Sequence, residues 1–335
     1  MPSAATSIRV PSFAKINLDL RVLERRADGY HELRTIFQTV NLHDLLEVTF
    51  ERARRTQIEL AASIEIPNNL VLGAARAVLD HLRLNARITF RLTKRIPMGA
   101  GLGGGSSNAA AVLLALPALA GRPLGGRELA SLAGQLGSDV PFFLHGGTAI
   151  GVGRGTELYP LPDLSAVSGL LVASGIHVST AEAYKALNRA SVETGAASLQ
   201  IVTNALTTQS ESPILGEFQA LAWALRAARI PDLAFRNDFE EVVFEQHPAL
   251  GRMLSKLRRL GASPARMTGS GSAVFGLFAS REEARMASLK FPVSTAFPFL
   301  FVPRSRYESS WRRALGPAFE HSVFAAASGR SQSRH

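Results

Sequence analysis

The sequence predicts an α+β protein built from two domains. Its 335 residues exceed the usual size of a single hydrophobic core, and 46% of them are hydrophobic, which is enough for two cores. Residues 45–51 and 88–94 alternate apolar and polar side chains, as half-buried strands do, whereas residues 69–82 and 127–137 place apolar residues at helical spacing. Strands and helices are therefore mixed in one chain, and strands with one wet face favour an antiparallel or mixed sheet.

The expected elements of the first domain follow one another up to Pro160. The strand at 45–51 precedes the helix at 69–82, for which Asn69 is a suitable N-cap, and the strand at 88–94 comes next. A glycine-rich stretch then leads into an apolar helix, and the hydroxyls of Ser106 and Ser107 suit its N-cap. The helix at 127–137 ends at Gly137, as a C-cap glycine predicts.

New strands and helices begin after Pro160. Residues 169–174 form an apolar run typical of a buried strand, and residues 214–228 have helical spacing. A further helix at 247–261 has Pro248 at its first position and Gly261 at its end. We therefore expect a boundary between Pro160 and Asp163, with domains at 1–160 and 161–303 and a basic extension at 304–335.

The composition excludes several classes of function. The chain has no cysteine, so disulfides, thiolate metal sites and a cysteine nucleophile are excluded, in keeping with a reducing compartment. The first 20 residues lack the basic start and sustained apolar stretch of a secretory signal. Residues 109–120 form the only consistently apolar part of the longest uncharged run, and a membrane span needs about 20 such residues. We expect a cytoplasmic protein that does not enter the membrane.

The net charge of +10 indicates an anionic partner: nucleic acid, an acidic membrane surface or an anionic small substrate. Residues 304–335 carry six arginines and two glutamates, a net +4, in a segment rich in serine and alanine. We interpret them as a solvated, partly disordered extension, with a terminal strand or helix that returns to the first domain as the alternative. A second alternative is a nucleic-acid-binding surface that uses "RSRYESSWRRALG", where basic and aromatic residues are interleaved.

The stretch "PMGAGLGGGSSNAAAVLLAL" from Pro97 predicts a phosphate-binding loop. It has five glycines between Gly99 and Gly105, after a strand and before a helix. The start of a helix exposes unpaired N–H groups and the positive end of the dipole, and absent side chains would make room for phosphates. Three well-known versions of such a loop do not fit: no acidic residue stands about 20 positions after the glycines for a dinucleotide fold, no GKS or GKT follows for a P-loop, and the HRD and DFG motifs of protein kinases are absent.

This stretch resembles the phosphate-loop motif of the GHMP kinases, in the variant with a triple glycine. Three further stretches support the resemblance: "AKINLDLRVLERRADGYHELRTIFQTVNLHD" from Ala14, "LGSDVPFFLHGGTAIGVGRGT" from Leu136 and "RMTGSGSAVFGLF" from Arg266. Together they cover about residues 10–302. The resemblance implies the two-domain GHMP kinase fold with the active site in the interdomain cleft. It also implies a small-molecule kinase, an enzyme that transfers a phosphoryl group to an alcohol.

The resemblance assigns the catalytic roles to Lys15 and Asp139. From the residues alone, Asp139 fits a turn as well as it fits catalysis, and an embedded lysine usually extends to solvent. In the family such an aspartate orients the attacking hydroxyl, and the lysine beside it attracts the transferring phosphoryl group. The resemblance also assigns ATP to a larger set: Asn69, Pro97, Gly99, Ala100, Gly101, Leu102, Gly103, Gly104, Gly105, Ser106 and Ser107.

The acceptor that the resemblance implies is cytidine diphosphate methylerythritol, phosphorylated on its 2-hydroxyl in non-mevalonate (MEP) isoprenoid biosynthesis. Tyr30 and Tyr184 would sandwich the cytosine and His31 would hydrogen-bond its edge, because an aromatic pair suits a flat base. The other substrate residues implied are Asn17, Thr180, Gly269 and Gly271.

ATP would enter as its magnesium complex, with no tightly bound cofactor, and the sequence identifies no metal ligand. We expect a monomer or homodimer and no membrane or nucleic-acid partner. Two alternatives stay open: another GHMP kinase, for homoserine, mevalonate or a sugar, and a basic nucleic-acid-binding protein.

Overall fold

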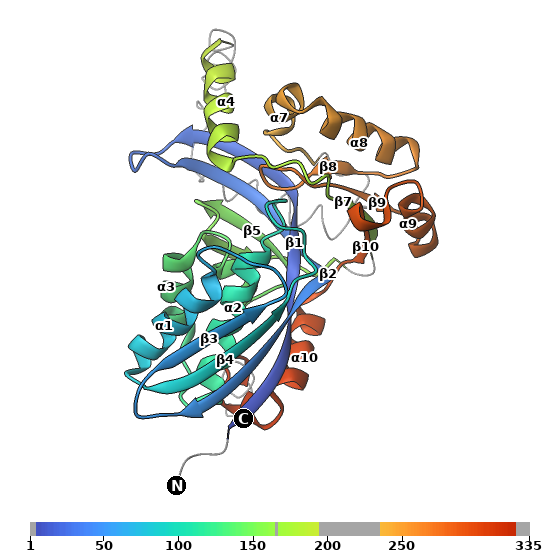
Figure 1. The fold of residues 1–335 in the computed structure, drawn as a ribbon. Helices are drawn as coiled ribbons and strands as arrows, with labels where there is room; N and C mark the ends of the chain where they lie inside the picture. Colours follow the sequence, from blue (N-terminus) through green and yellow to red (C-terminus); the bar gives the residue numbers. More distant parts are fainter. Residues whose placement is uncertain (1–4, 165–166, 194–234, 326–335) are drawn as a thin grey trace, which may run out of the picture.

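Two β-sheets, each covered by helices, make up the described part of the protein (Figure 1). The computed structural model describes residues 5–164, 167–193 and 235–325. Mixed strands and helices confirm the α+β class, and the first sheet is mixed, because β3 runs parallel to β4 whereas its other pairs are antiparallel. The expected helix at 214–228 lies outside the described residues.

The first sheet has the order β3-β4-β2-β5-β6, and β1 pairs with the remaining edge of β2. β2 is paired to β5 through its first half and to β4 through its second half, so the strand expected at 45–51 is one half of a much longer strand. The strands are β1 (Thr6–Arg25), β2 (His31–Arg52), β3 (Gln57–Ala62), β4 (Ala86–Thr93), β5 (Thr148–Gly153) and β6 (Glu157–Pro160).

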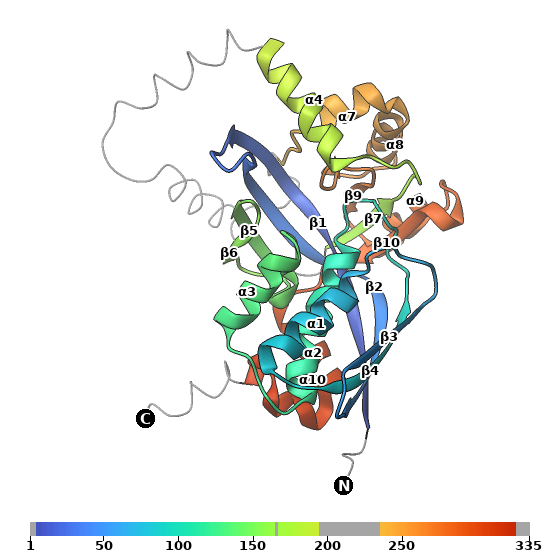
Figure 2. The same cartoon turned by 60° about the vertical axis from the view of Figure 1, so that its left-hand side comes forward.

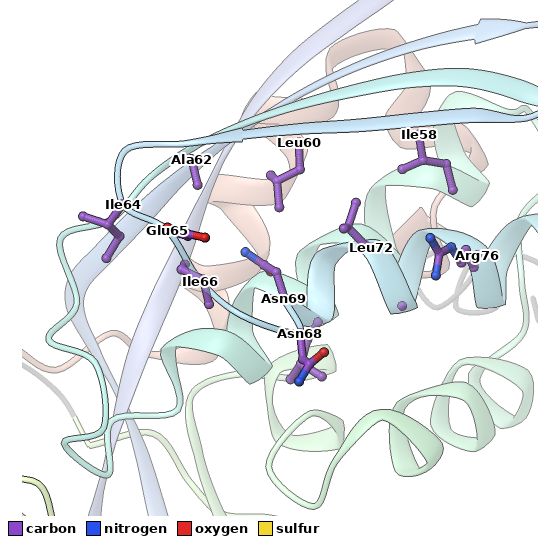
Figure 3. A pocket seen from close by; sticks show the side chains of 12 residues that line it. Ile58, Leu60, Ala62, Ile64, Glu65, Ile66, Asn68, Asn69, Leu72 and Arg76 are labelled. Atoms are coloured by element: carbon purple, nitrogen blue, oxygen red, sulfur yellow. The ribbon is translucent and has the colours of Figure 1, made fainter.

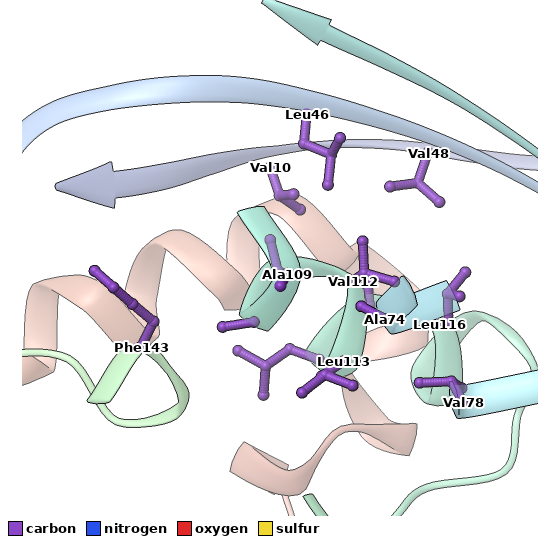
Figure 4. Close-up of a cluster of buried hydrophobic side chains, with 14 of the residues drawn as sticks. Val10, Leu46, Val48, Ala74, Val78, Ala109, Val112, Leu113, Leu116 and Phe143 are labelled. Atoms are coloured by element: carbon purple, nitrogen blue, oxygen red, sulfur yellow. The ribbon is translucent and has the colours of Figure 1, made fainter. Parts of the chain in front are cut away.

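Helices cover one face of this sheet (Figure 2). They are α1 (Leu70–Leu82), α2 (Gly104–Leu119), α3 (Gly126–Leu136) and the short 3-10 helix η1 (Pro141–Leu144). Figure 4 shows Leu46 and Val48 of the sheet facing Val112 and Leu116 of α2. α2 is buried nearly all round, because it lies between the sheet and the neighbouring helices, and this explains why its sequence is apolar without helical periodicity.

The second sheet has the order β10-β7-β9-β8, with every pair antiparallel. Its strands are β7 (Ser168–Val172), β8 (Ala265–Met267), β9 (Val274–Phe278) and β10 (Ala296–Leu300). The accompanying helices are α4 (Thr180–Glu193), α7 (Glu240–Gln246), α8 (Pro248–Arg259), α9 (Arg281–Ser288) and the 3-10 helix η3 (Val293–Thr295). Pro248 begins α8 and Gly261 follows its end with a φ of +96°, as expected.

Strand β1 is buried on both faces where it passes between the two sheets. Ile16 and Leu18 pack in the cluster that joins the first sheet to β7, β9 and β10. The alternate residues Lys15, Asn17 and Asp19 are also buried, at 3 to 4% exposure. Ile16 and Leu18 pack toward the second sheet. The polar row on the opposite face is covered by the glycine loop, by Thr268 and by Arg236, and it becomes part of an interior site.

The interpretation of residues 304–335 as a solvated extension is wrong for residues 304–325. Helix α10 (Arg304–Leu315) and the 3-10 helix η4 (Gly316–His321) return to the first sheet. Tyr307 and Trp311 are 3% and 2% exposed in its core, and the Tyr307 hydroxyl donates a hydrogen bond to the backbone carbonyl of Phe143. The arginines lie mostly on the outer side of an amphipathic helix, which a count of charges alone does not distinguish from a solvated tail.

No helix among the described residues is both long enough and apolar enough to cross a lipid bilayer.

Candidate active site

A lysine and an aspartate from distant parts of the chain meet beside the end of α3. Lys15 Nζ lies 3.4 Å from Asp139 Oδ2. The Lys15 side chain is 4% exposed and that of Asp139 is 33% exposed. Asp139 follows Gly137, the C-cap of α3, and precedes Pro141, which starts η1 and restricts the backbone there. The pair therefore presents an accessible carboxylate backed by a buried ammonium group.

The Lys15 ammonium is fixed by groups from both sheets. Its Nζ donates a 2.7 Å hydrogen bond to Asn17 Oδ1 and lies 5.3 Å from the centre of the Phe37 ring. Asn17 Nδ2 donates in turn to Thr35 Oγ1 at 2.7 Å, and the Asn17 backbone N–H donates to Thr268 Oγ1 at 3.0 Å. Thr268 comes from the loop between β8 and β9, so this network ties the second sheet to the lysine. Sequence reasoning missed Thr268, although it stands in the quoted motif "RMTGSGS".

The glycine loop runs from the end of β4 to the start of α2. Gly99, Gly101 and Gly103 have positive φ values of 64°, 75° and 68°, which other residues rarely adopt. α2 begins at Gly104 with Gly103 as its N-cap, and Ser107 donates its backbone N–H to the Gly103 carbonyl at 2.8 Å. The expectation that the serines cap the helix is wrong, because Ser106 and Ser107 lie within its first turn.

At Gly101 and Gly103 the absent side chains make room for neighbouring parts of the protein. A Cβ on Gly103 would lie 2.8 Å from Phe143 Cζ and 3.2 Å from Lys15 Cγ. A Cβ on Gly101 would collide with the Thr268 carbonyl oxygen. These two glycines therefore allow the loop to approach Lys15 and the second sheet, and the unpaired N–H groups at the start of α2 suit an anion.

A cavity of about 390 Å³ lies over the glycine loop. Asn69 of the preceding helix start, Lys94 at the end of β4 and Ser106 of α2 line it, as do Pro97–Gly105 of the loop itself. Ser107 is not among its lining residues and is 2% exposed. The structure thus gathers the expected ATP residues around one space, with Ser107 behind it.

Sequence reasoning also missed a buried charge cluster beneath the loop. Lys94 Nζ forms an ion pair with Asp44 Oδ2, and their side chains are 5% and 0% exposed. The other Asp44 oxygen accepts the backbone N–H groups of Arg95 and Ile96 at 2.8 and 2.9 Å, and Asn108 Nδ2 donates to Asp44 Oδ2 at 3.0 Å. Asp44 therefore fixes the chain at the entrance to the loop and neutralises a lysine that lines the cavity over the loop.

The signal for this cluster was present in the strand pattern. Asp44 shares its inward face with Leu46 and Val48 in the alternation of β2, and all three are buried. A carboxylate at an inward position needs a partner.

Asn69 combines a cap with an unused donor. Its Oδ1 accepts the Val71 backbone N–H at 3.0 Å and so caps α1, whereas its buried Nδ2 has no hydrogen-bond partner in the described part of the chain. Beside it, a larger cavity of about 710 Å³ runs between β3 and α1 (Figure 3), with Ile58, Leu60 and Leu72 among its lining residues. An apolar cavity with one free amide donor suits a flat heterocycle with an acceptor on its edge.

The aromatic residues expected at the acceptor site lie in the turn between β1 and β2, at the start of β2 and in the first part of α4. His31 stacks on Tyr184 with ring centres 5.2 Å apart, and Phe239 meets the edge of Tyr184 at 4.8 Å. Burial, followed by the charge of Asp139, raises the pKa of Tyr184 to about 12, so Tyr184 is close enough to Asp139 to interact with its charge. Tyr30 is 53% exposed and carries the Arg154 guanidinium on its ring. The ring stacked on Tyr184 is thus His31, whereas the resemblance paired Tyr184 with Tyr30 across a base.

The second glycine loop lies against the first. A Cβ on Gly269 would be 3.3 Å from Gly101 Cα, and Gly271 has a φ of +98°. Asn237 Nδ2 donates to the Gly269 carbonyl at 2.8 Å, which fixes this loop from behind. Thr180 Oγ1 lies 2.9 Å from Ser270 Oγ, so the start of α4 is joined to the same loop.

Chemically, the arrangement joins a cavity with an anion-binding helix start to an accessible carboxylate beside a buried cation. These are the parts that phosphoryl transfer to an alcohol requires. Within the residues that the structure describes, no group of three or more His, Asp or Glu side chains is placed to hold a metal ion.

The comparisons with known proteins agree with this geometry. The model of the GHMP kinases N terminal domain matches residues 69–147, and that of the GHMP kinases C terminal matches residues 220–292. A 4-diphosphocytidyl-2-C-methyl-D-erythritol kinase from Solibacter usitatus is 53% identical over 304 residues, which cover 91% of this chain and 92% of the relative. One of the same name from Thermodesulfovibrio yellowstonii is 36% identical over 84% of this chain and 92% of its own length.

Solved structures show the same fold. A crystal structure of 4-(cytidine 5'-diphospho)-2C-methyl-D-erythritol kinase matches with a TM-score of 0.70 and 33% identity, over 88% of this chain and 99% of that one. The homoserine kinase of Cytophaga hutchinsonii, at 17% identity, has a TM-score of 0.62 over 90% of this chain and 96% of its own, which is a likeness of fold.

Proposed function

The chain belongs to the 4-diphosphocytidyl-2-C-methyl-D-erythritol kinases among the GHMP kinases, and from this membership we infer that it phosphorylates 4-diphosphocytidyl-2-C-methyl-D-erythritol with ATP. It is therefore a kinase of the MEP route to isoprenoid precursors. We propose that the acceptor atom is the 2-hydroxyl oxygen, that ATP enters as its magnesium complex, and that the reaction takes place in the cytoplasm. The single observation that carries the mechanism is the 3.4 Å separation of Lys15 and Asp139 beside the glycine loop.

In the proposed mechanism, Asp139 orients the acceptor hydroxyl and takes its proton. The hydroxyl oxygen attacks the γ-phosphorus of ATP, the bond from that phosphorus to the β,γ-bridging oxygen breaks, and ADP leaves. Lys15 stabilises the charge that builds on the transferring group, and the low exposure of its side chain strengthens this interaction because little water screens it. No phosphoenzyme is required, since hydroxyl and phosphoryl group meet directly.

We propose that ATP lies in the joined cavities around Asn69. The free Asn69 Nδ2 supports a hydrogen bond to the adenine edge, with the apolar residues of β3 and α1 around the ring. The β- and γ-phosphates would lie over Gly101–Ser106 at the start of α2, where the helix dipole favours anions. Lys94 lines the same cavity and adds a cation there.

We propose that the cytidine end of the acceptor binds at Tyr30, His31 and Tyr184. Support comes from the buried, unpartnered His31 Nδ1 in the described part of the chain, which offers a ring nitrogen to the edge of a base. The electrostatic interaction between Tyr184 and Asp139 supports a cytidine site close to the proposed catalytic pair.

The test is coupled ADP release with the cytidylyl acceptor, repeated on Asp139→Asn. Loss of a general base typically lowers the rate by about 10² to 10⁴, while ATP binding, measured separately with the nucleotide alone, stays intact. The neighbouring Ser138→Ala is the matched control and should retain turnover within about twofold. Near-normal turnover of Asp139→Asn would refute the mechanism. Homoserine, mevalonate and galactose as acceptors separate the alternatives, since turnover with one of these and not with the cytidylyl acceptor contradicts the assignment.

A further inference from the structure

An arginine outside the expected site lies flat on one of its aromatic residues. Arg154 Cζ is 3.7 Å from the centre of the Tyr30 ring. Arg154 stands in the tight turn between β5 and β6, where Gly153 and Gly155 have φ values of +68° and +83°. The Gly155 backbone N–H donates to the Val152 carbonyl at 3.0 Å and closes the turn. The turn therefore holds the arginine backbone at a fixed place beside the tip that carries Tyr30.

The two tips are joined by a carboxylate. Glu32 Oε1 accepts a hydrogen bond from the Gly153 backbone N–H at 2.8 Å, and Glu32 Oε2 accepts one from Arg26 Nη1 at 2.6 Å. Asp28 accepts from Arg26 Nε at 3.2 Å and from the Tyr30 backbone N–H at 3.1 Å. These bonds raise the pKa of Arg26, chiefly through Glu32, and lower the pKa of Asp28, chiefly through the Tyr30 N–H. The turn with Arg154 and the turn with Tyr30 thus form one assembly.

We propose that Arg154 is a positioning residue for the acceptor base: its guanidinium covers one face of Tyr30 and holds the ring with the other face toward the cytosine. This inference rests on the proposed function, which places the base at Tyr30. The reason is that a tyrosine side chain 53% exposed otherwise rotates freely and loses that freedom when a ligand stacks on it. A planar guanidinium stacked on the ring fixes it beforehand.

Arg154 stacks directly on the Tyr30 ring, whereas its interaction with Asp28 is the smallest of the effects that lower the pKa of that carboxyl. A role through stacking is therefore favoured over a role as a free cation for the acceptor diphosphate. Lysine can replace Arg154 as a free cation but cannot replace it in stacking, since an ammonium group keeps the charge but has no flat face.

The experiment measures KM and kcat for acceptor and ATP in Arg154→Met and Arg154→Lys, with Arg127→Met on the exposed side of α3 as the matched loss of charge. We expect both Arg154 variants to raise the acceptor KM about 3- to 10-fold, with kcat and the ATP KM unchanged within about twofold, because binding is lost equally in the ground and transition states. Full recovery by Arg154→Lys would show that charge acts instead of stacking, and would overturn the inference. An unchanged acceptor KM in Arg154→Met would overturn it as well, because the base would then bind without a fixed Tyr30 ring. A lower acceptor KM would also overturn it, because the base would then compete with Arg154 for the same face of Tyr30.

A double-mutant cycle with Tyr30→Leu separates the role of Arg154 from the placement of the base at Tyr30. If Arg154 acts through Tyr30, Arg154→Met has no further effect on the acceptor KM once the ring is gone. An equal effect in both backgrounds means that Arg154 touches the acceptor itself, which overturns the inference. If Tyr30→Leu alone leaves the acceptor KM unchanged, the placement of the base at Tyr30 fails, and the inference fails with it. If Tyr30→Leu raises that KM and Arg154→Met does not, only the inference fails.

Discussion

Replacing Gly103 by alanine tests why the phosphate loop lacks side chains. Gly103 has a φ of +68°, so alanine there adopts a left-handed conformation that costs about 1 to 2 kcal/mol. The new Cβ would also lie 2.8 Å from Phe143 Cζ and 3.2 Å from Lys15 Cγ. Real Cβ contacts are longer than the first of these, so Phe143 must move, and overpacking of a filled site costs about 1 to 3 kcal/mol more. The expected total loss of stability is about 2 to 5 kcal/mol.

Gly121 supplies the matched control. It has a similar φ of +64°, yet no atom lies within 4 Å of the Cβ that alanine would add. Gly121→Ala therefore carries the backbone strain without the collision. The difference in stability between the two variants isolates the packing of Gly103 against Phe143 and Lys15, and it should be about 1 to 3 kcal/mol.

Urea unfolding followed by tryptophan fluorescence measures this difference, since Trp311 is buried in the same core. The same variants are assayed for kcat/KM. Displacing Lys15 by part of an ångström should lower kcat/KM about 10- to 100-fold in Gly103→Ala, whereas Gly121→Ala keeps the parent value. If Gly103→Ala matches Gly121→Ala in both stability and turnover, the loop does not depend on this close approach and the reasoning is refuted.

Three further changes test the parts around the site. Asp44→Asn leaves the buried Lys94 ammonium without its carboxylate and should lower the free energy of unfolding by about 3 to 5 kcal/mol, most of it recovered when Lys94→Met is added; a loss that the second change does not relieve contradicts the pairing. Tyr307→Phe removes the donor to the Phe143 carbonyl and should cost about 1 to 3 kcal/mol in urea unfolding, and a neutral effect would mean that α10 does not anchor the segment after Asp139. Burial raises the pKa of Glu240 above its ordinary value of 4.5, so the folded state keeps a proton that the unfolded state releases, and stability falls as the pH rises through that window. Glu240→Gln should accordingly stabilise the protein more near neutral pH than at about pH 4, and equal effects at the two pH values would contradict the burial of the charge.

The sequence by itself determined the local features of this protein. Asn69 caps α1 by bonding to Val71, only two residues away, and Gly137 ends α3 where the apolar spacing stops. Strand alternation at 88–94 and the glycine motif before α2 depend likewise on neighbours within a few positions. Such features can be predicted because capping, periodicity and turn chemistry act over one or two turns of the chain. The resemblance to GHMP kinases added the fold and the class of reaction, which the relatives bear out.

Only the tertiary structure decided what surrounds these features. Lys15 meets Asp139, and Thr268 reaches Asn17 beside them, because strand β1 is enclosed by two sheets whose strands are far apart in sequence. The same packing brings Phe143 and Lys15 against Gly103. Residues 304–325 return to the first core, although their charges suggested a solvated tail. The physical reason is that the burial of a side chain depends on what packs over it, and no local pattern specifies which distant element that is.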